Sequence, residues 1–300
     1  MSVVATLLSG QLLFAALVTG AIYALVALGL NLVYGTLRML NVAHGDVVML
    51  GAYAAYWTFS GLGVSPLVAA PAIAMLGALA GWLLYRGVIR RLLGSGATAS
   101  TRLEGNSLLL FFGLSIIVQN AVALAFTPNN RGYSHLDQVH QLAGVAMTGN
   151  RIAALAIAGA TCVGAALFLS RSLAGLSMRA VIERREAAYI VGIDVDRVQA
   201  ASFAIGFASA ALAGVLLSML EQFSPFSGFP YTIAAFIVII LGGLGNVAAG
   251  LGAALLLGVL ETYGVALTSA NLRSVLLYGV FVGALLLFPR GLFARRAARA

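Results

Sequence analysis

Residues Arg171–Arg197 read RSLAGLSMRAVIERREAAYIVGIDVDR and form the longest strongly charged interval of the chain. The interval holds arginines and carboxylates throughout, whereas apolar runs of membrane-spanning length flank it on both sides. A helix needs about 20 apolar residues to cross the hydrocarbon core. The interval is therefore predicted to be a loop between two spans. It is either a passive connector or the handle on which a protein outside the bilayer acts.

The composition of the whole chain indicates a membrane protein. Of 300 residues, 61% are hydrophobic and 9% are charged, whereas a typical soluble domain carries about 25% charged residues. The opening MSVVATLLSGQLLF has no basic region and no small-residue cleavage site, so we interpret it as a retained span rather than a signal peptide. We predict an all-α polytopic membrane protein with a single transmembrane domain over residues 1–300.

The charged residues exclude several classes of protein. All 17 basic residues are arginine, so a Walker A loop and lysine Schiff-base chemistry are both excluded. The arginines lie at the ends of apolar runs rather than on one soluble face, so nucleic acid is not expected as a partner. His44, His135 and His140 form no clustered pattern with the single Cys162. No metal site, cofactor or catalytic cluster is therefore expected.

The apolar runs predict eight or nine membrane-embedded helical segments, some of them broken or re-entrant. The expected segments are Leu12–Leu30, Val47–Phe59, Pro66–Tyr85, Leu108–Phe126, Ile152–Leu169, Val198–Leu220, Tyr231–Tyr263 and Val275–Phe288. Tyr231–Tyr263 is too long for one ordinary crossing and is broken at Gly242–Asn246, where helix propensity is low. Small residues also recur at helical spacing, as in Gly77 with Gly81 and in Gly206–Ala210–Gly214, and these predict closely packed helices.

The distribution of arginine predicts the orientation in the membrane. Cytoplasmic loops carry an excess of arginine and lysine, so the charged interval 171–197 and the tail 289–300 are placed in the cytoplasm. Only Arg131, Arg151 and Arg273 then lie outside, together with the polar loop Thr127–Arg151. The amino terminus is expected outside as well.

The charged interval itself predicts a short amphipathic helix. Ser177 can cap a helix that runs to Val191, with Gly192 as its stop. On this helix Met178, Ile182 and Tyr189 share one face. Two interpretations stay open, since such a helix can rest on lipid headgroups or dock a partner protein.

Charge pairing and capping complete the prediction for this interval. Arg179 and Glu183 form an i,i+4 pair on another side of the helix. Asp196 is expected to cap the next span, with Gln199 three residues later as in a capping box.

Two further stretches combine polar residues and glycine within apolar sequence. In Asn31–Asp46 the polar positions are Asn31, Tyr34, Arg38, Asn41, His44 and Asp46. This stretch is either a cytoplasmic loop or a broken helix at a translocation pathway, because non-helical backbone at membrane depth must be buried or line a cavity. Gly242–Asn246 is either a hairpin turn or a discontinuous helix near a substrate route. Both stretches hold glycine and asparagine within apolar sequence, which hints at two related halves.

Few ionisable residues lie within the spans. Glu221 and Glu261 are near span ends, and Asp46 borders one. This scarcity argues against a carrier driven by protons or sodium through buried carboxylates. Because the chain also lacks a nucleotide loop, any energy source is expected on another chain, and the charged interval is the obvious place for it to act.

Three stretches resemble a known family. GLNLVYGTLRMLNVAHGDVVMLGAY (Gly29–Tyr53) is similar to the amino-terminal signature of the branched-chain amino acid ABC transporter permeases, in their LivH-like branch. RAVIERREAAYIVGIDVDRV (Arg179–Val198) resembles the cytoplasmic coupling segment of that family. FIVIILGGLGNVAAGLGAALLLGVLE (Phe236–Glu261) resembles its glycine-rich late segment. The resemblance covers nearly the whole chain, from about Gly20 to Gly291.

The resemblance implies an importer half-channel in the bacterial inner membrane. Two ABC ATPase subunits, a second homologous permease subunit and a periplasmic substrate-binding protein would be its partners, and the loop Thr127–Arg151 would face the binding protein. The residues expected to couple to the ATPase are Arg179, Glu183, Glu186, Tyr189 and Gly192. The residues expected along the translocation pathway are Asn31, Tyr34, Asn41, His44, Gly243 and Asn246. The alternative function is a stand-alone channel or facilitator for a small neutral solute such as urea or an amide.

Overall fold

The computed structural model describes residues 9–94, 100–142, 144–243, 245–288 and 291–292. Its longer helices are α2 (Gly10–Leu37), α3 (His44–Leu62), α4 (Pro66–Leu84), α6 (Ser100–Phe126), α7 (Gly149–Arg171), α10 (Val195–Ser218), α11 (Gly228–Gly242), α12 (Val247–Leu267) and α13 (Arg273–Leu287). The short elements are the π-helical turn η1 (Tyr85–Ile89), α5 (Arg90–Gly94), β1 (Val139–Leu142), β2 (Val145–Thr148), α8 (Leu173–Glu183), α9 (Arg185–Ile190) and the 3₁₀ turn η2 (Ala270–Leu272).

The helices confirm the all-α polytopic prediction. Within the described chain, seven helices are long and apolar enough to cross a membrane, and α11 is a shorter apolar helix. The predicted number of eight or nine embedded segments therefore holds approximately. Several boundaries differ, because helices continue beyond the apolar runs. Helix α2 reaches Leu37 rather than Leu30, α6 begins at Ser100 rather than Leu108, and helical structure continues past Tyr85 to Gly94.

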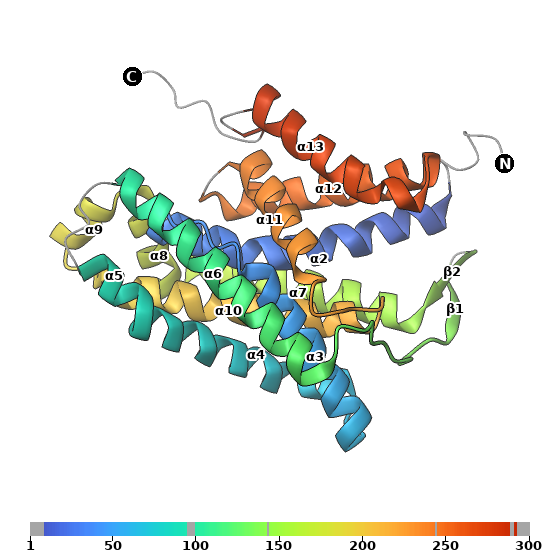
Figure 1. Ribbon diagram of the computed structural model, residues 1–300. Coiled ribbons are helices and arrows are strands. Elements are labelled where there is room, and N and C mark those ends of the chain that lie inside the picture. Colours follow the sequence, from blue (N-terminus) through green and yellow to red (C-terminus); the bar gives the residue numbers. More distant parts are fainter. Residues whose placement is uncertain (1–8, 95–99, 143, 244, 289–290, 293–300) are drawn as a thin grey trace.

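The two ends of the bundle differ in structure (Figure 1). Helices α8 and α9 lie at one end, called here the α8–α9 end, and the antiparallel β1–β2 hairpin lies at the other, called the hairpin end. The hairpin belongs to the loop Thr127–Arg151 and was not predicted. The arginines expected outside also lie at the hairpin end, where Arg131 pairs with Phe223 through the backbone and Arg273 begins α13. The predicted tail 289–300 lies outside the described residues except for positions 291 and 292.

Helices α2 and α10 form the centre of the bundle. In the most apolar part of each, 67% and 72% of the residues are buried, whereas none of the other described spans exceeds 33%. The two helices are antiparallel, since Gly29 packs on Gly206 while Thr36 bonds Gln199. A Cβ on Gly29 would overlap the Gly206 carbonyl oxygen, so the absence of a side chain permits this approach.

Small residues also bring the outer helices onto this centre. A Cβ on Gly258 of α12 would overlap Gly20 of α2, and a Cβ on Gly81 of α4 would lie 2.5 Å from the Phe203 carbonyl oxygen of α10. Gly214 of α10 lies directly on the Val48 carbonyl of α3. The predicted packing role of these glycines is confirmed.

Helices α3 and α11 both begin inside the bundle. His44, the first residue of α3, bonds the carbonyl of Val26 near the middle of α2, and Gly45 packs on Gly228, the first residue of α11. From this junction α3 runs to the hairpin end, where Phe59 contacts the ring of Tyr133. Helix α11 runs the opposite way.

The two halves of the bundle are therefore related by reversal of direction. Each central helix, α2 or α10, is followed by a non-helical return and a helix that begins inside the bundle, α3 or α11. A span then follows that packs on the central helix of the other half: α4 on α10, and α12 on α2. The sequence pattern hinted at two halves, but it took Gly242–Asn246 as the break in the second half. That stretch is a hairpin turn, in which Gly242 packs on Gly250 and the Asn246 side chain caps α12. The corresponding break precedes Gly228.

The Gly29–Gly206 contact predicts a specific sensitivity to substitution. Gly29→Val should prevent folding or lower stability by about 1–3 kcal/mol or more, because the added atoms have no space. Thermal unfolding of the detergent-purified chain, followed by size-exclusion chromatography, measures the effect. Gly164→Ala on α7 is the control, since open space surrounds it. Equal stability of both variants would contradict the close packing of α2 and α10.

Candidate functional site

The charged interval folds as two short helices rather than one. Ser172, not Ser177, caps α8 by accepting a hydrogen bond from the Gly175 N–H at 2.9 Å. The helix stops at Glu183, and Arg184 is extended (φ −150°) before α9 begins. The predicted stop at Gly192 is confirmed, because this residue has φ +82°, which favours glycine. Ser177 was predicted as the cap because serine is a common N-cap residue. Its hydroxyl instead donates to the Leu173 carbonyl within the helix.

The break at Arg184 turns the predicted apolar face in two directions. Met178 is buried and packs in a small core with Val181 and Ala188. Tyr189, which was expected on the same face, is 76% exposed, and it is followed by Ile190 at 83% and Val191 at 74%. Three consecutive exposed apolar residues at the tip of a charged loop are unusual on a monomer and indicate a contact surface. We call Tyr189–Val191 the apolar tip.

The residues predicted for coupling line two grooves on either side of α8 and α9. Arg179 and Glu183 line a groove of about 610 Å³, together with Asn246 from the set predicted for the translocation pathway. Glu186, Tyr189 and Gly192 line another of about 1190 Å³. Arg179 does not form the expected ion pair with Glu183 but donates to the Ser170 carbonyl at 3.2 Å.

A polar network lies beneath the larger groove. The Tyr85 hydroxyl, on a side chain that is almost fully buried, lies 2.7 Å from Asp196 Oδ1 and 2.9 Å from Gln199 Oε1. Arg90 pairs with the second oxygen of Asp196 at 3.2 Å. The Gln199 amide donates to the Thr36 carbonyl at 3.1 Å. The network thus joins η1, α10 and α2 at the level of the coupling helices.

This network corrects the capping prediction. Asp194, not Asp196, caps α10 by accepting from the Arg197 N–H at 3.1 Å. Asp196 and Gln199 face Tyr85 instead. No sequence pattern pointed to this role for Tyr85, except that this tyrosine ends an apolar run immediately before an arginine.

The stretch Asn31–Asp46 is not a cytoplasmic loop, which was one of its two interpretations, and part of it is helical. Its first part continues α2 to Leu37, and Arg38 ends the helix in the left-handed conformation (φ 58°). The side chain of Asn31 is buried and accepts from the Gly245 N–H at 2.9 Å, next to Tyr34 one turn on. Gly243 and Asn246 therefore lie in the turn beside this end of α2, and the broken-helix interpretation describes the geometry.

The start of α3 holds a buried polar cluster. Asn41 and His44 are both fully buried, and Asp46 is nearly so. Within the described residues, neither amide atom of Asn41 has a hydrogen-bond partner, and neither does Nδ1 of His44. Thr232 of α11 connects the two helices, because its hydroxyl accepts from the Gly45 N–H at 2.8 Å and donates to the Val42 carbonyl at 3.1 Å. Unpaired buried polar groups are costly, and they often mark functional positions.

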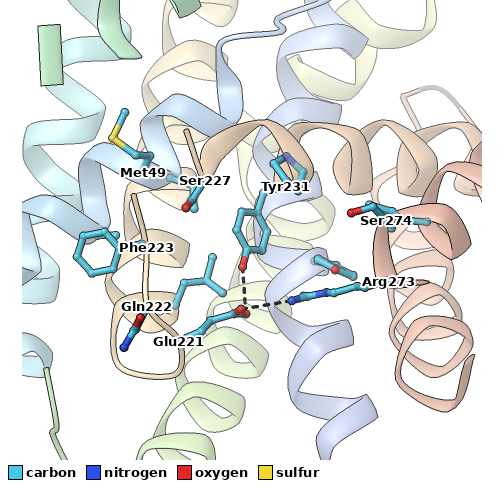
Figure 2. Close-up of a pocket in the computed structure, with 14 residues that line it drawn as sticks. Met49, Glu221, Gln222, Phe223, Ser227, Tyr231, Arg273 and Ser274 are labelled. Atoms are coloured by element: carbon cyan, nitrogen blue, oxygen red, sulfur yellow. Dashed lines mark hydrogen bonds and ion pairs between the residues drawn. The ribbon is translucent and has the colours of Figure 1, made fainter. Parts of the chain in front are cut away.

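A second group of charged residues lies in a cleft at the hairpin end (Figure 2). The Arg273 guanidinium reaches both Glu221 and Glu261, and the Tyr231 hydroxyl donates to Glu221 at 3.0 Å. The Tyr23 hydroxyl donates to Glu261. Two adjoining cavities of about 230 and 450 Å³ share Tyr23, Glu221, Tyr231 and Arg273, and Glu261 lines the larger one. The sequence showed both glutamates near span ends but did not bring them to one site.

The buried cluster at the start of α3 predicts conformation-dependent access. Under the importer function that the resemblance implies, cysteines placed at Asn41 and His44 should react with an aqueous thiol reagent at rates that change when ATP is supplied together with the ATPase subunits. Both positions are buried here, so the reaction requires another conformation. A cysteine at Ala154, which is also fully buried but lies on α7, is the control. Inaccessibility of positions 41 and 44 in every state would show that they are packing residues.

Comparisons with known proteins agree with this architecture. A family model described as "Branched-chain amino acid transport system / permease component" matches residues 12–288. The high-affinity branched-chain amino acid transport system permease protein BraD of Pseudomonas aeruginosa is 32% identical over 295 residues, which cover 95% of each chain. LivH of Escherichia coli K12 is 30% identical with the same coverage, and a probable LivH of Methanocaldococcus jannaschii is 25% identical. No solved structure matches the chain significantly. The chain belongs to the permease family of the branched-chain amino acid transport systems.

Proposed function

We propose that the chain is the membrane-spanning permease subunit of an ATP-driven importer for branched-chain amino acids in the bacterial inner membrane. Family membership and the seven candidate spans support a transport subunit rather than an enzyme. The relatives named above are permeases of amino acid transport systems, and this favours an amino acid over urea or an amide as the substrate.

The α8–α9 end is proposed to face the cytoplasm and to bind the ATPase. The single observation that carries this assignment is the apolar tip, which is exposed between Arg185 and Glu186 on one side and Gly192 on the other. A hydrophobic centre with a charged rim is typical of protein interfaces. A helix resting on lipid would instead bury its apolar residues along one continuous side, whereas the break at Arg184 separates Met178 from Tyr189.

The geometry also supports a route by which ATPase closure reaches the spans. Ile182 of α8 lies against Gly35 of α2 and Gly245 before α12, so a shift of α8 presses on both helices. The Tyr85 network ties η1 to α10 on the other side of α9. A second homologous permease subunit would complete the pathway, and a periplasmic binding protein would deliver substrate to the hairpin end.

The proposed function predicts strict dependence on partner chains. In proteoliposomes, leucine uptake should require the ATPase subunits, the binding protein and ATP together, because the chain has no nucleotide loop and no ion-coupling carboxylate relay. Radiolabelled leucine uptake measures this, with vesicles lacking one component at a time as controls. Uptake by the chain alone would contradict the importer and favour a facilitator.

The apolar tip predicts the effect of altering the coupling surface. Glu183→Arg combined with Tyr189→Ala should reduce ATPase binding at least about tenfold, since truncation of a central interface aromatic commonly costs more than 1 kcal/mol. Co-purification with a tagged ATPase subunit measures the loss. Leu124→Ala is the control, because Leu124 is 88% exposed but lies on the span α6. Normal ATPase binding and normal leucine uptake by the double variant would contradict a coupling role for this surface.

A further inference from the structure

We propose that the cleft at the hairpin end binds the substrate as a zwitterion, with Arg273 donating to its carboxylate and Glu221 accepting from its ammonium group. This inference rests on the transport function proposed above and adds a substrate contact within this chain. The Arg273 guanidinium makes two contacts that differ in burial, one with Glu261 and one with Glu221.

The first contact anchors Arg273. Its Nε donates to Oε1 of Glu261, whose other carboxylate oxygen accepts from the Tyr23 hydroxyl. Glu261 is 5% exposed and Tyr23 3% exposed. A carboxylate buried to this extent needs its cation, because removing one member of a buried pair leaves an uncompensated charge. The contact with Glu261 therefore holds the guanidinium in the cleft.

The second contact is exchangeable. Nη1 of Arg273 lies 3.3 Å from Oε2 of Glu221, and both side chains are 43% exposed. Ion pairs at this exposure contribute little to stability. A guanidinium has five N–H donors, and the contacts with Glu261 and Glu221 use two of them. Arg273 thus retains donors for an incoming carboxylate, and the loss of its long contact with Glu221 costs little.

Glu221 is oriented for a cation. The Tyr231 hydroxyl donates to Oε1 of Glu221 at 3.0 Å, which leaves Oε2 as the oxygen shared with Arg273. An ammonium group placed at Oε2 would replace the guanidinium there. Charge-assisted hydrogen bonds of this kind are stronger than those between neutral groups. Adjacent positive and negative groups fit a neutral zwitterion better than a ligand that carries a single charge.

The rest of the cleft fits an aliphatic side chain. The cavity of about 230 Å³ beside the charged residues is lined by Val48, Met49, Leu217, Phe223 and Leu277. Figure 2 shows Met49 and Phe223 on the side of the cleft opposite Arg273, with Glu221 between them. Small-ligand sites typically combine such an apolar wall with a few oriented polar groups. The site therefore matches an amino acid with a branched hydrocarbon side chain.

The two charged ends can be tested separately with leucine analogues. The purified complex of permease and ATPase subunits in nanodiscs, without the binding protein, should bind L-leucine saturably. It should bind 4-methylpentanoate, which lacks the ammonium group, and leucinamide, which lacks the carboxylate, at least about tenfold more weakly. In Glu221→Gln, leucine should lose its advantage over 4-methylpentanoate but keep its advantage over leucinamide. Calorimetric titration measures these affinities.

Asp137→Asn is the matched control, since it removes one carboxylate charge at the same end but outside the cavity. It should bind all three ligands as the wild type does. The site is overturned if Glu221→Gln keeps the wild-type order of affinities, or if the wild type binds no leucine. Leucine uptake by the complete transporter separates this result from failure of the proposed function. If the wild type takes up leucine but Glu221→Gln leaves the affinities unchanged, only the proposed binding site is contradicted. If the wild type takes up no leucine, the proposed transport function is contradicted.

Discussion

The close antiparallel approach of α2 and α10 is the constraint on which the rest of the structure depends. Gly29 and Gly206 let the two backbones touch, and both helices are buried along most of their apolar length. In a membrane, helix association depends on such contact rather than on exclusion of water. Because the two central helices lie so close together, α3 and α11 can both begin beside them, where Gly45 packs on Gly228. From there the two helices run toward opposite ends.

Both ends of the protein are consequently built on the same two helices. At the α8–α9 end, the network from Tyr85 reaches Gln199 of α10 and, through it, Thr36 of α2. At the hairpin end, Tyr23 of α2 and Leu217 of α10 line both cavities of the charged cleft. The two helices thus connect the α8–α9 end with the charged cleft, and we infer that a force applied at one end reaches the other by moving α10 against α2.

Sequence patterns predicted the parts of the structure that depend on local properties. Apolar length placed the spans, and Gly192 ended its helix as expected, because a positive φ is a property of one residue. The predictions that Ser177 caps the first helix of the charged interval and that Asp196 caps α10 were wrong. Neighbouring residues were equally good local candidates, and the contacts in the folded chain decided between them. The charged cleft was not predicted for the same reason, because Glu221, Glu261 and Arg273 are distant in sequence and only the fold brings them together.

We propose that the apolar tip contacts a protein rather than lipid. A photoreactive amino acid at Ile190, in membranes containing the assembled transporter, tests this claim most directly. A docked ATPase subunit should give an adduct whose yield changes when ATP is hydrolysed, and the same probe at Leu124 on α6 should give no such adduct. Adducts with lipid alone at position 190 would contradict this proposal.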